Sequence, residues 1–118
     1  MQYAHITLRV RDLEKSLAFY QGVLGLPVVR RLGGPNGPVF LGETAGPTIE
    51  LIGGAEDPRF AGFSIGFTVD SLAEAEKRLE EAGFSRIRGP LSPNPSVVFS
   101  FFGDPDGVEI QLVEYRNG

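Results

Sequence analysis

The sequence predicts an α+β fold built from two similar βαβββ modules that form a curved, half-open mixed sheet. Two observations predict this class. Residues 5–26 read as an alternating strand followed by an amphipathic helix, and the same order restarts at residue 64. Short alternating apolar stretches follow each helix, separated by glycine- and proline-rich turns. Because a half-sheet of this size is too small to bury its own apolar face, we expect each module to close on a partner, either the other half or a second chain.

The first module is expected to begin with a strand whose two faces differ. Apolar residues at 6, 8 and 10 alternate with polar ones, and the polar face starts with His5, the single histidine of the chain. Asp12 is placed to cap a helix of about three turns that stops at Gly25. Further strands are expected at 39–41 and 48–52, with another short one possible at 28–32.

A glycine- and charge-rich stretch separates the two modules. We expect one domain over residues 1–118, made of module 1–53 and module 62–118 joined by the linker 54–61. In the second module the expected order is a strand at 64–69, a helix that starts with the capping box of Ser71 and Glu74 and ends before Gly83, a loop at 88–96, and strands at 97–102 and 108–114 around the turn 104–107.

Composition narrows the classes of partner. Fifteen acidic residues outnumber eleven basic ones, and no Lys/Arg cluster is present, so a nucleic acid or an anionic membrane is not the expected partner. The absence of cysteine excludes disulfides, thiolate metal sites and cysteine nucleophiles. The chain enters its first strand without a signal-peptide pattern, and no apolar run reaches membrane-spanning length. We therefore expect a cytoplasmic protein whose partner is a small molecule or another protein.

The internal repeat relates four polar residues to one another in two pairs. His5 corresponds to Ser64 and Glu50 corresponds to Gln111, each pair about sixty residues apart. Alternation places each of them on the less apolar side of its strand. If they face one cavity, this is the placement that a metal site with oxygen and nitrogen ligands on strands requires. A lone strand histidine is otherwise a hydrogen-bonded structural residue.

The same alternation extends the candidate cavity. Arg9 either pairs with a carboxylate, Glu50 or Glu109, or binds an anionic ligand. The phenylalanines of 99–102 are expected mainly in the core, with at least one facing the cavity, where it would suit a flat or apolar ligand. The candidate ligand-binding residues are His5, Thr7, Arg9, Glu50, Ser64, Thr68, Phe101, Glu109 and Gln111.

Several segments together resemble the vicinal oxygen chelate superfamily, which includes glyoxalase I, bleomycin-resistance proteins and extradiol dioxygenases. They are the strand that opens with His5, the Asp-Leu-x-x-Ser-x-x-Phe-Tyr helix at 12–20 with Leu-Gly-Leu at 24–26, the Ile-Glu-Leu strand at 49–51, and Asp-Pro-Asp-Gly at 104–107 before a final Ile-x-Leu strand. The resemblance implies paired βαβββ modules in a cup-shaped half-open barrel, and a homodimer.

For function the resemblance implies a metal site that this chain matches only in part. His5 and Glu50 match the ligand pattern of glyoxalase I, whereas Ser64 stands where a histidine is expected and Gln111 where a glutamate is expected. Extradiol dioxygenases need two histidines, so that activity is disfavoured here.

We therefore expect a protein that binds a small organic molecule without a cofactor, similar to the bleomycin-resistance branch, whose cationic ligands suit an acidic chain. The alternative is a glyoxalase I-type lyase or isomerase with one divalent metal (Ni, Zn, Mn or Fe) on His5, Glu50 and Gln111, and with Glu50 as the catalytic residue. Whether the protein is an enzyme stays open on these grounds.

Overall fold

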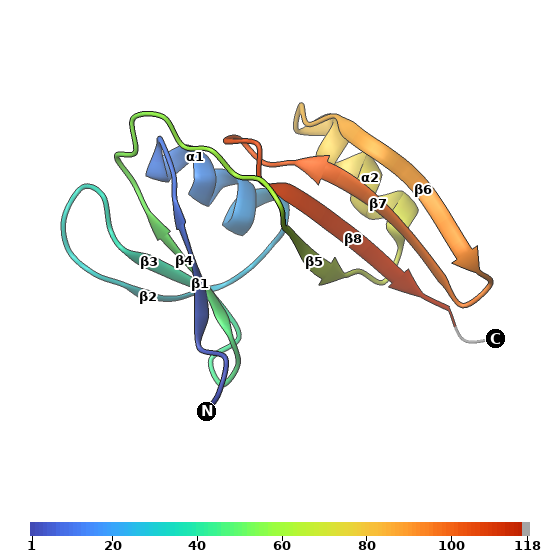
Figure 1. The fold of residues 1–118 in the computed structure, drawn as a ribbon, viewed down its shortest axis with the longest axis horizontal. Coiled ribbons are helices and arrows are strands. Elements are labelled where there is room, and N and C mark those ends of the chain that lie inside the picture. Colours follow the sequence, from blue (N-terminus) through green and yellow to red (C-terminus); the bar gives the residue numbers. More distant parts are fainter. Residues whose placement is uncertain (117–118) are drawn as a thin grey trace. The chain divides into compact units, whose positions relative to one another are not determined.

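The computed structural model describes residues 1–116 of the chain. The backbone divides into two compact units, Met1–Arg59 (unit 1) and Phe60–Gly118 (unit 2). Each unit contains a four-stranded sheet and a helix in the order βαβββ (Figure 1). The expected α+β class with two similar modules is therefore confirmed.

Unit 1 is a mixed sheet with strand order β1-β4-β3-β2. β1 runs parallel to β4, and the other neighbours are antiparallel. Leu8, Leu41 and Leu51 are fully buried on one face of this sheet. The elements are β1 (His5–Arg9), α1 (Leu13–Leu17), the π-helix η1 (Ala18–Val23), β2 (Val28–Arg31), β3 (Val39–Gly42) and β4 (Thr48–Ile52).

The helix of unit 1 starts as predicted and then widens. The Asp12 carboxylate accepts hydrogen bonds from the backbone N–H groups of Glu14 and Lys15 at 3.0 and 3.2 Å, as an N-cap does. After Leu17 the bonds reach back five residues, as from the N–H of Leu24 to the carbonyl of Phe19 at 2.9 Å. The second half of the expected three-turn helix is thus a π-helix, which residue spacing did not predict.

Unit 2 repeats the topology, with strand order β5-β8-β7-β6. β5 and β8 are parallel and the other pairs antiparallel. Leu79, Phe102 and Ile110 are fully buried, and α2 packs against β7 and β8. The elements are β5 (Ser64–Thr68), α2 (Leu72–Glu81), β6 (Arg86–Asn94), β7 (Val97–Gly103) and β8 (Glu109–Tyr115).

One prediction made from the sequence, the loop at 88–96, is wrong. Residues 88–96 were expected to be a loop because they hold a glycine and three prolines, but β6 extends through Asn94. β6 is an edge strand that pairs only with β7, and its register shifts three times along the pair. Prolines are tolerated at a sheet edge and at bulges, because no ladder hydrogen bond is required of their nitrogen there.

Each sheet therefore has one apolar face that belongs to the core and one face that carries polar side chains, which we call the open face. No helix within residues 1–116 is long and apolar enough to cross a membrane.

Candidate functional site

A row of four side chains crosses the open face of unit 1. The strand register pairs Thr7 with Glu50, Glu50 with Phe40, and Phe40 with Arg30. Residues that are direct partners on neighbouring strands project from the same face of a sheet. The four side chains, from four different strands, are therefore neighbours although they span more than forty positions of the sequence.

The carboxylate of Glu50 is held at the centre of this row. The Thr7 hydroxyl donates a hydrogen bond of 2.5 Å to Oε1 of Glu50, and Nε2 of His5 lies 3.6 Å from the same oxygen. The His5 ring also meets the Phe40 ring edge to face, with centroids 5.8 Å apart. On the other side of that ring, the guanidinium carbon of Arg30 lies 4.7 Å from the centroid, a cation–π contact.

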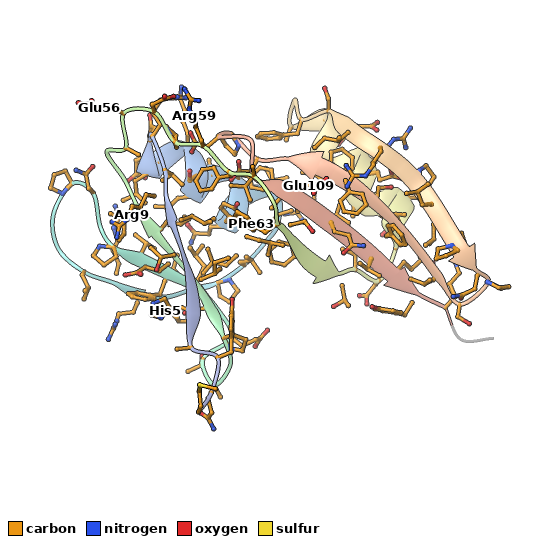
Figure 2. The ribbon with its side chains drawn as sticks, viewed as in Figure 1. His5, Arg9, Glu56, Arg59, Phe63 and Glu109 are labelled. Carbon is orange, nitrogen blue, oxygen red and sulfur yellow. The ribbon has the colours of Figure 1, made fainter. Side chains whose placement is uncertain are left out.

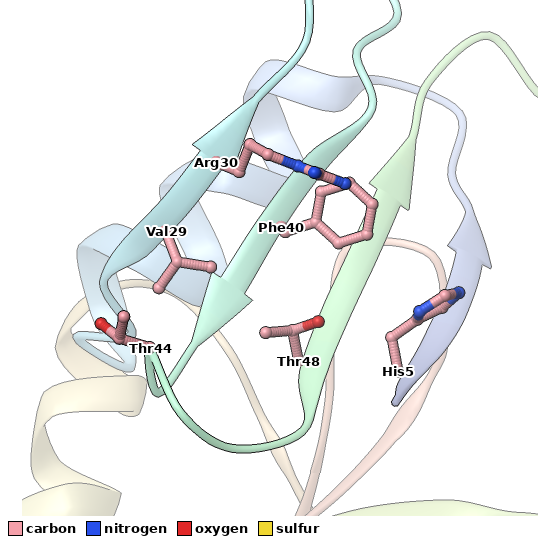
Figure 3. Close-up of a pocket in the computed structure, with 6 residues that line it drawn as sticks. All are labelled: His5, Val29, Arg30, Phe40, Thr44 and Thr48. Carbon is pink, nitrogen blue, oxygen red and sulfur yellow. The ribbon is translucent and has the colours of Figure 1, made fainter. Parts of the chain in front are cut away.

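A pocket of about 320 Å³ adjoins this row (Figure 3). Arg30 extends over the Phe40 ring, while His5 and Thr48 border the same space from the neighbouring strands. The volume is at the small end of ligand sites in proteins, so it suits a compact group or one end of a larger molecule. The lining residues are His5, Val29, Arg30, Phe40, Thr44 and Thr48.

Unit 2 has an equivalent row of four residues, in which Gly66 replaces Thr7 and Gln111 replaces Glu50. The register pairs Gly66 with Gln111, Gln111 with Phe101, and Phe101 with Arg88. The guanidinium carbon of Arg88 lies 3.9 Å from the Phe101 centroid, so the arginine–phenylalanine contact occurs in both units. A Cβ built on Gly66 would lie 3.2 Å from Oε1 of Gln111, so the amide lies close above the glycine.

The two units differ more in the neighbouring row of paired residues, which contains His5 in unit 1 and Ser64 in unit 2. In unit 1 the register pairs His5 with Thr48, and in unit 2 it pairs Ser64 with Glu109. The Glu109 carboxylate forms an ion pair of 2.5 Å with Arg88. Glu109 thus occupies the position that Thr48 occupies in unit 1.

The structure brings the sequence-predicted residues together in two groups. His5, Thr7 and Glu50 meet in unit 1, and Phe101, Glu109 and Gln111 share the open face of unit 2, as their register requires. Within unit 2, Ser64 and Thr68 lie on the same face, at the two ends of β5.

Arg9 lies at the opposite end of β1 from His5 and is exposed (Figure 2). The carboxylates considered as its partners have other neighbours. Thr7 and His5 contact Glu50, and Arg88 binds Glu109. Within the described residues of unit 1, Glu50 pairs with His5 and not with Arg9. An ion pair of Arg9 with Glu109 and the recognition of an anionic ligand by Arg9 both stay predictions.

Sequence reasoning missed Arg30, Phe40 and Arg88. A signal for the phenylalanine was present, because Val-Phe-Leu-Gly at 39–42 aligns with Ser-Phe-Phe-Gly at 100–103 at the same offset that relates Glu50 to Gln111. The arginines are harder to find, since a register shift interrupts the pairing of β2 with β3 and of β6 with β7.

The four repeat-related positions offer an uneven set of metal donors. His5 and Glu50 supply an imidazole and a carboxylate, whereas Ser64 and Gln111 supply a hydroxyl and a neutral amide. Within residues 1–116 no three His, Cys, Asp or Glu side chains are grouped so that they could hold a metal ion. Because hydroxyl and amide oxygens are weak donors to Ni, Zn or Fe beside an imidazole, these residues do not fit a tightly held divalent metal of that kind.

Comparison with known proteins places this geometry in context. The family model described as the Glyoxalase/Bleomycin resistance protein/Dioxygenase superfamily matches residues 2–112. A lactoylglutathione lyase of Neisseria meningitidis serogroup A is 35% identical over 100% of this chain and 94% of its own length.

Two solved structures are similar along nearly the whole chain. A member of the same superfamily from Sphaerobacter thermophilus is 30% identical with a TM-score of 0.75, covering 97% of both chains. TnmS3, an antibiotic binding protein from Streptomyces sp. CB03234, has a TM-score of 0.78 at 23% identity, covering 98% of this chain and 96% of its own, and is a likeness of fold.

Proposed function

Because this chain belongs to the Glyoxalase/Bleomycin resistance protein/Dioxygenase superfamily, we propose that it binds a small organic molecule on its open sheet faces without a tightly held metal. In this proposal the binding residues are those predicted from the sequence, together with Arg30 and Phe40 of the pocket in unit 1. The protein acts as a homodimer in the cytoplasm.

The observation that carries the proposal is the contrast between two equivalent positions. Glu50 and Gln111 occupy the same place in the two rows, each beside a phenylalanine. The carboxyl group of Glu50 accepts a hydrogen bond from Thr7, whereas Gln111 carries an amide and lies over Gly66. A glutamine has no proton-accepting state at neutral pH, so the second position cannot act as a general base.

A second candidate is a metal-dependent lyase or isomerase of glyoxalase I type. The identity to lactoylglutathione lyases favours it, and so does the proximity of Nε2 of His5 to the Glu50 carboxylate. In that case His5, Glu50 and Gln111 would hold the metal, which would supply a Lewis acid for a bound oxygen, and Glu50 would be the catalytic residue.

Metal analysis separates the two candidates. The full chain, purified without chelator and freed of any affinity tag, is dialysed against Ni²⁺, Zn²⁺, Mn²⁺ or Fe²⁺, and the bound metal is measured by mass spectrometry. We expect far less than one metal per chain. In the variant that carries both Ser64→His and Gln111→Glu, which restores the expected donors, we expect metal content to rise.

Stoichiometric metal in the wild-type protein that is lost in His5→Ala would overturn the proposal in favour of the lyase or isomerase. An assay of lactoylglutathione lyase activity on the same samples provides the matching readout, and activity that requires metal and disappears in Glu50→Gln would have the same meaning.

A further inference from the structure

The two units differ in what their equivalent arginines contact. Arg88 lies against Phe101 and also pairs with the carboxylate of Glu109. Arg30 lies against Phe40 in the same way, but no carboxylate within residues 1–116 is paired with it. The ion pair of the neighbouring residue Arg31 with Glu14, at 2.9 Å, leaves the guanidinium of Arg30 uninvolved.

In unit 2 the arginine therefore contacts both a carboxylate and a phenylalanine. Among the residues that the structure describes, the equivalent arginine of unit 1 contacts the phenylalanine but no carboxylate. The register shows where the missing group belongs. Glu109 is the partner of Ser64, and the equivalent partner of His5 is Thr48. A threonine is shorter than a glutamate and uncharged, so this position cannot supply an anion to Arg30.

The pocket of unit 1 lies at this position. Thr48 and Arg30 both line it, and Phe40 forms part of its wall. A guanidinium that has no carboxylate partner in the described residues thus borders a space of about 320 Å³. Arg30 is exposed, and the Phe40 ring lies against its guanidinium. Arginine binds carboxylates through paired N–H donors in a planar fork.

We propose that this pocket binds the carboxylate of a small, flat organic acid, with the ligand taking the place that Glu109 takes in unit 2. The proposal rests on the proposed function in taking the ligand to be a small organic molecule, and it adds the charge and the contact residue. Arg30 binds the carboxylate, the Phe40 ring and Val29 contact the apolar body, and the hydroxyls of Thr44 and Thr48 are available to hydrogen-bond polar substituents.

The local charge differs from that of the whole chain. The net charge of −4 favours a cationic ligand on average. Glu50, the nearest acid in the row, is not among the residues that line the pocket, and its Oε1 already accepts from Thr7 and lies near His5. Salt screens charges that lie more than about 8 Å from Arg30, so the net charge of the chain has little effect on an anion in contact with its guanidinium.

The test uses benzoate as the probe, benzamide as its neutral analogue and phenylphosphonate as an alternative oxyanion. Binding to the full chain is followed by ¹H–¹⁵N correlation spectra during titration. We expect benzoate to shift resonances of Arg30, Phe40 and Thr48, and benzamide to bind at least about tenfold more weakly, since it lacks the charged hydrogen bonds.

Three variants test the assignment of Arg30. In Arg30→Gln we expect benzoate affinity to fall by about tenfold to a hundredfold, because a charged hydrogen-bonding partner is removed. The matched control is Arg31→Gln, which alters the adjacent arginine that pairs with Glu14, and it should bind benzoate as the wild type does. Glu109→Thr frees Arg88 and should create a second benzoate site in unit 2.

The proposal is overturned if benzamide binds as well as benzoate, or if Arg30→Gln binds benzoate as Arg31→Gln does. Tighter binding of phenylphosphonate than of benzoate overturns the assignment to a carboxylic acid. Metal analysis of the same samples keeps the two proposals separate. Stoichiometric metal with Arg30-dependent benzoate binding contradicts only the proposed function, and absent metal with Arg30-independent binding contradicts only the carboxylate site.

Discussion

Replacing Thr7 by valine removes the hydrogen bond that holds the Glu50 carboxylate, while nearly preserving the side-chain volume. The bond is 2.5 Å long and the Glu50 side chain is 15% exposed. A hydrogen bond to a charged group contributes about 1.5–3 kcal/mol to stability. Because Glu50 keeps some access to water, it can be partly rehydrated, so we expect the lower end, a loss of about 1.5 kcal/mol in the free energy of unfolding. For a small protein this lowers the urea midpoint by about 1 M.

The assay is urea unfolding followed by circular dichroism, with the slope of the transition checked for constancy. Thr68→Val is the control, because Thr68 is also on a strand of an open face and its hydroxyl has no hydrogen-bond partner in the described residues. A double-mutant cycle with Glu50→Gln should give a coupling energy of at least about 0.5 kcal/mol. A midpoint shift for Thr7→Val no larger than that for Thr68→Val, or a coupling energy of zero, would refute this account of Glu50.

Two further outcomes follow from unit 2. Leu79→Ala should lower the free energy of unfolding by about 2–5 kcal/mol, measured by urea unfolding, because the Leu79 side chain is 1% exposed and its removal leaves a cavity under α2; a loss below about 1 kcal/mol would contradict the packing described. A hydrogen bond from the Arg116 side chain and another from the backbone N–H of Leu72 hold the pKa of Glu114 below its ordinary value of 4.5. The ionised Glu114 carboxylate therefore stabilises the fold above pH 4.5, and this contribution is lost as the pH falls through the lowered pKa. The difference in stability between the wild type and Glu114→Gln should therefore be largest near pH 6 and shrink below about pH 4.5. Thermal unfolding at a series of pH values measures this difference. A difference that grows as the pH falls would contradict a lowered pKa for Glu114.

Much of the fold was predictable because it depends on short-range patterns. The N-cap Asp12 and the strand Thr48–Ile52 agree with the sequence prediction, since side-chain capping and period-two alternation are local properties. The strand β6 and the π-helix η1 were not predicted. Prolines are tolerated in β6 because it lies at the edge of its sheet, and residue spacing did not indicate the five-residue hydrogen bonds of η1.

The candidate site was predictable in part for the same reason. Alternation placed His5 and Glu50 on one face, and the structure puts their side chains 3.6 Å apart. The contact of Arg30 with Phe40 could not be derived in this way, because Val29 lies at a register shift that determines which β2 residue faces β3.

The sequence by itself determined that this chain repeats a βαβββ unit. It also determined that the second copy has a serine and a glutamine at the positions where the first copy has a histidine and a glutamate. Only the tertiary structure decided that each open face carries an arginine over a phenylalanine, and that Glu109 satisfies one arginine while Thr48 leaves the other beside a pocket. The physical reason is that periodicity along a strand is local, whereas neighbours across strands depend on hydrogen-bond register, which loops and bulges set over the whole sheet.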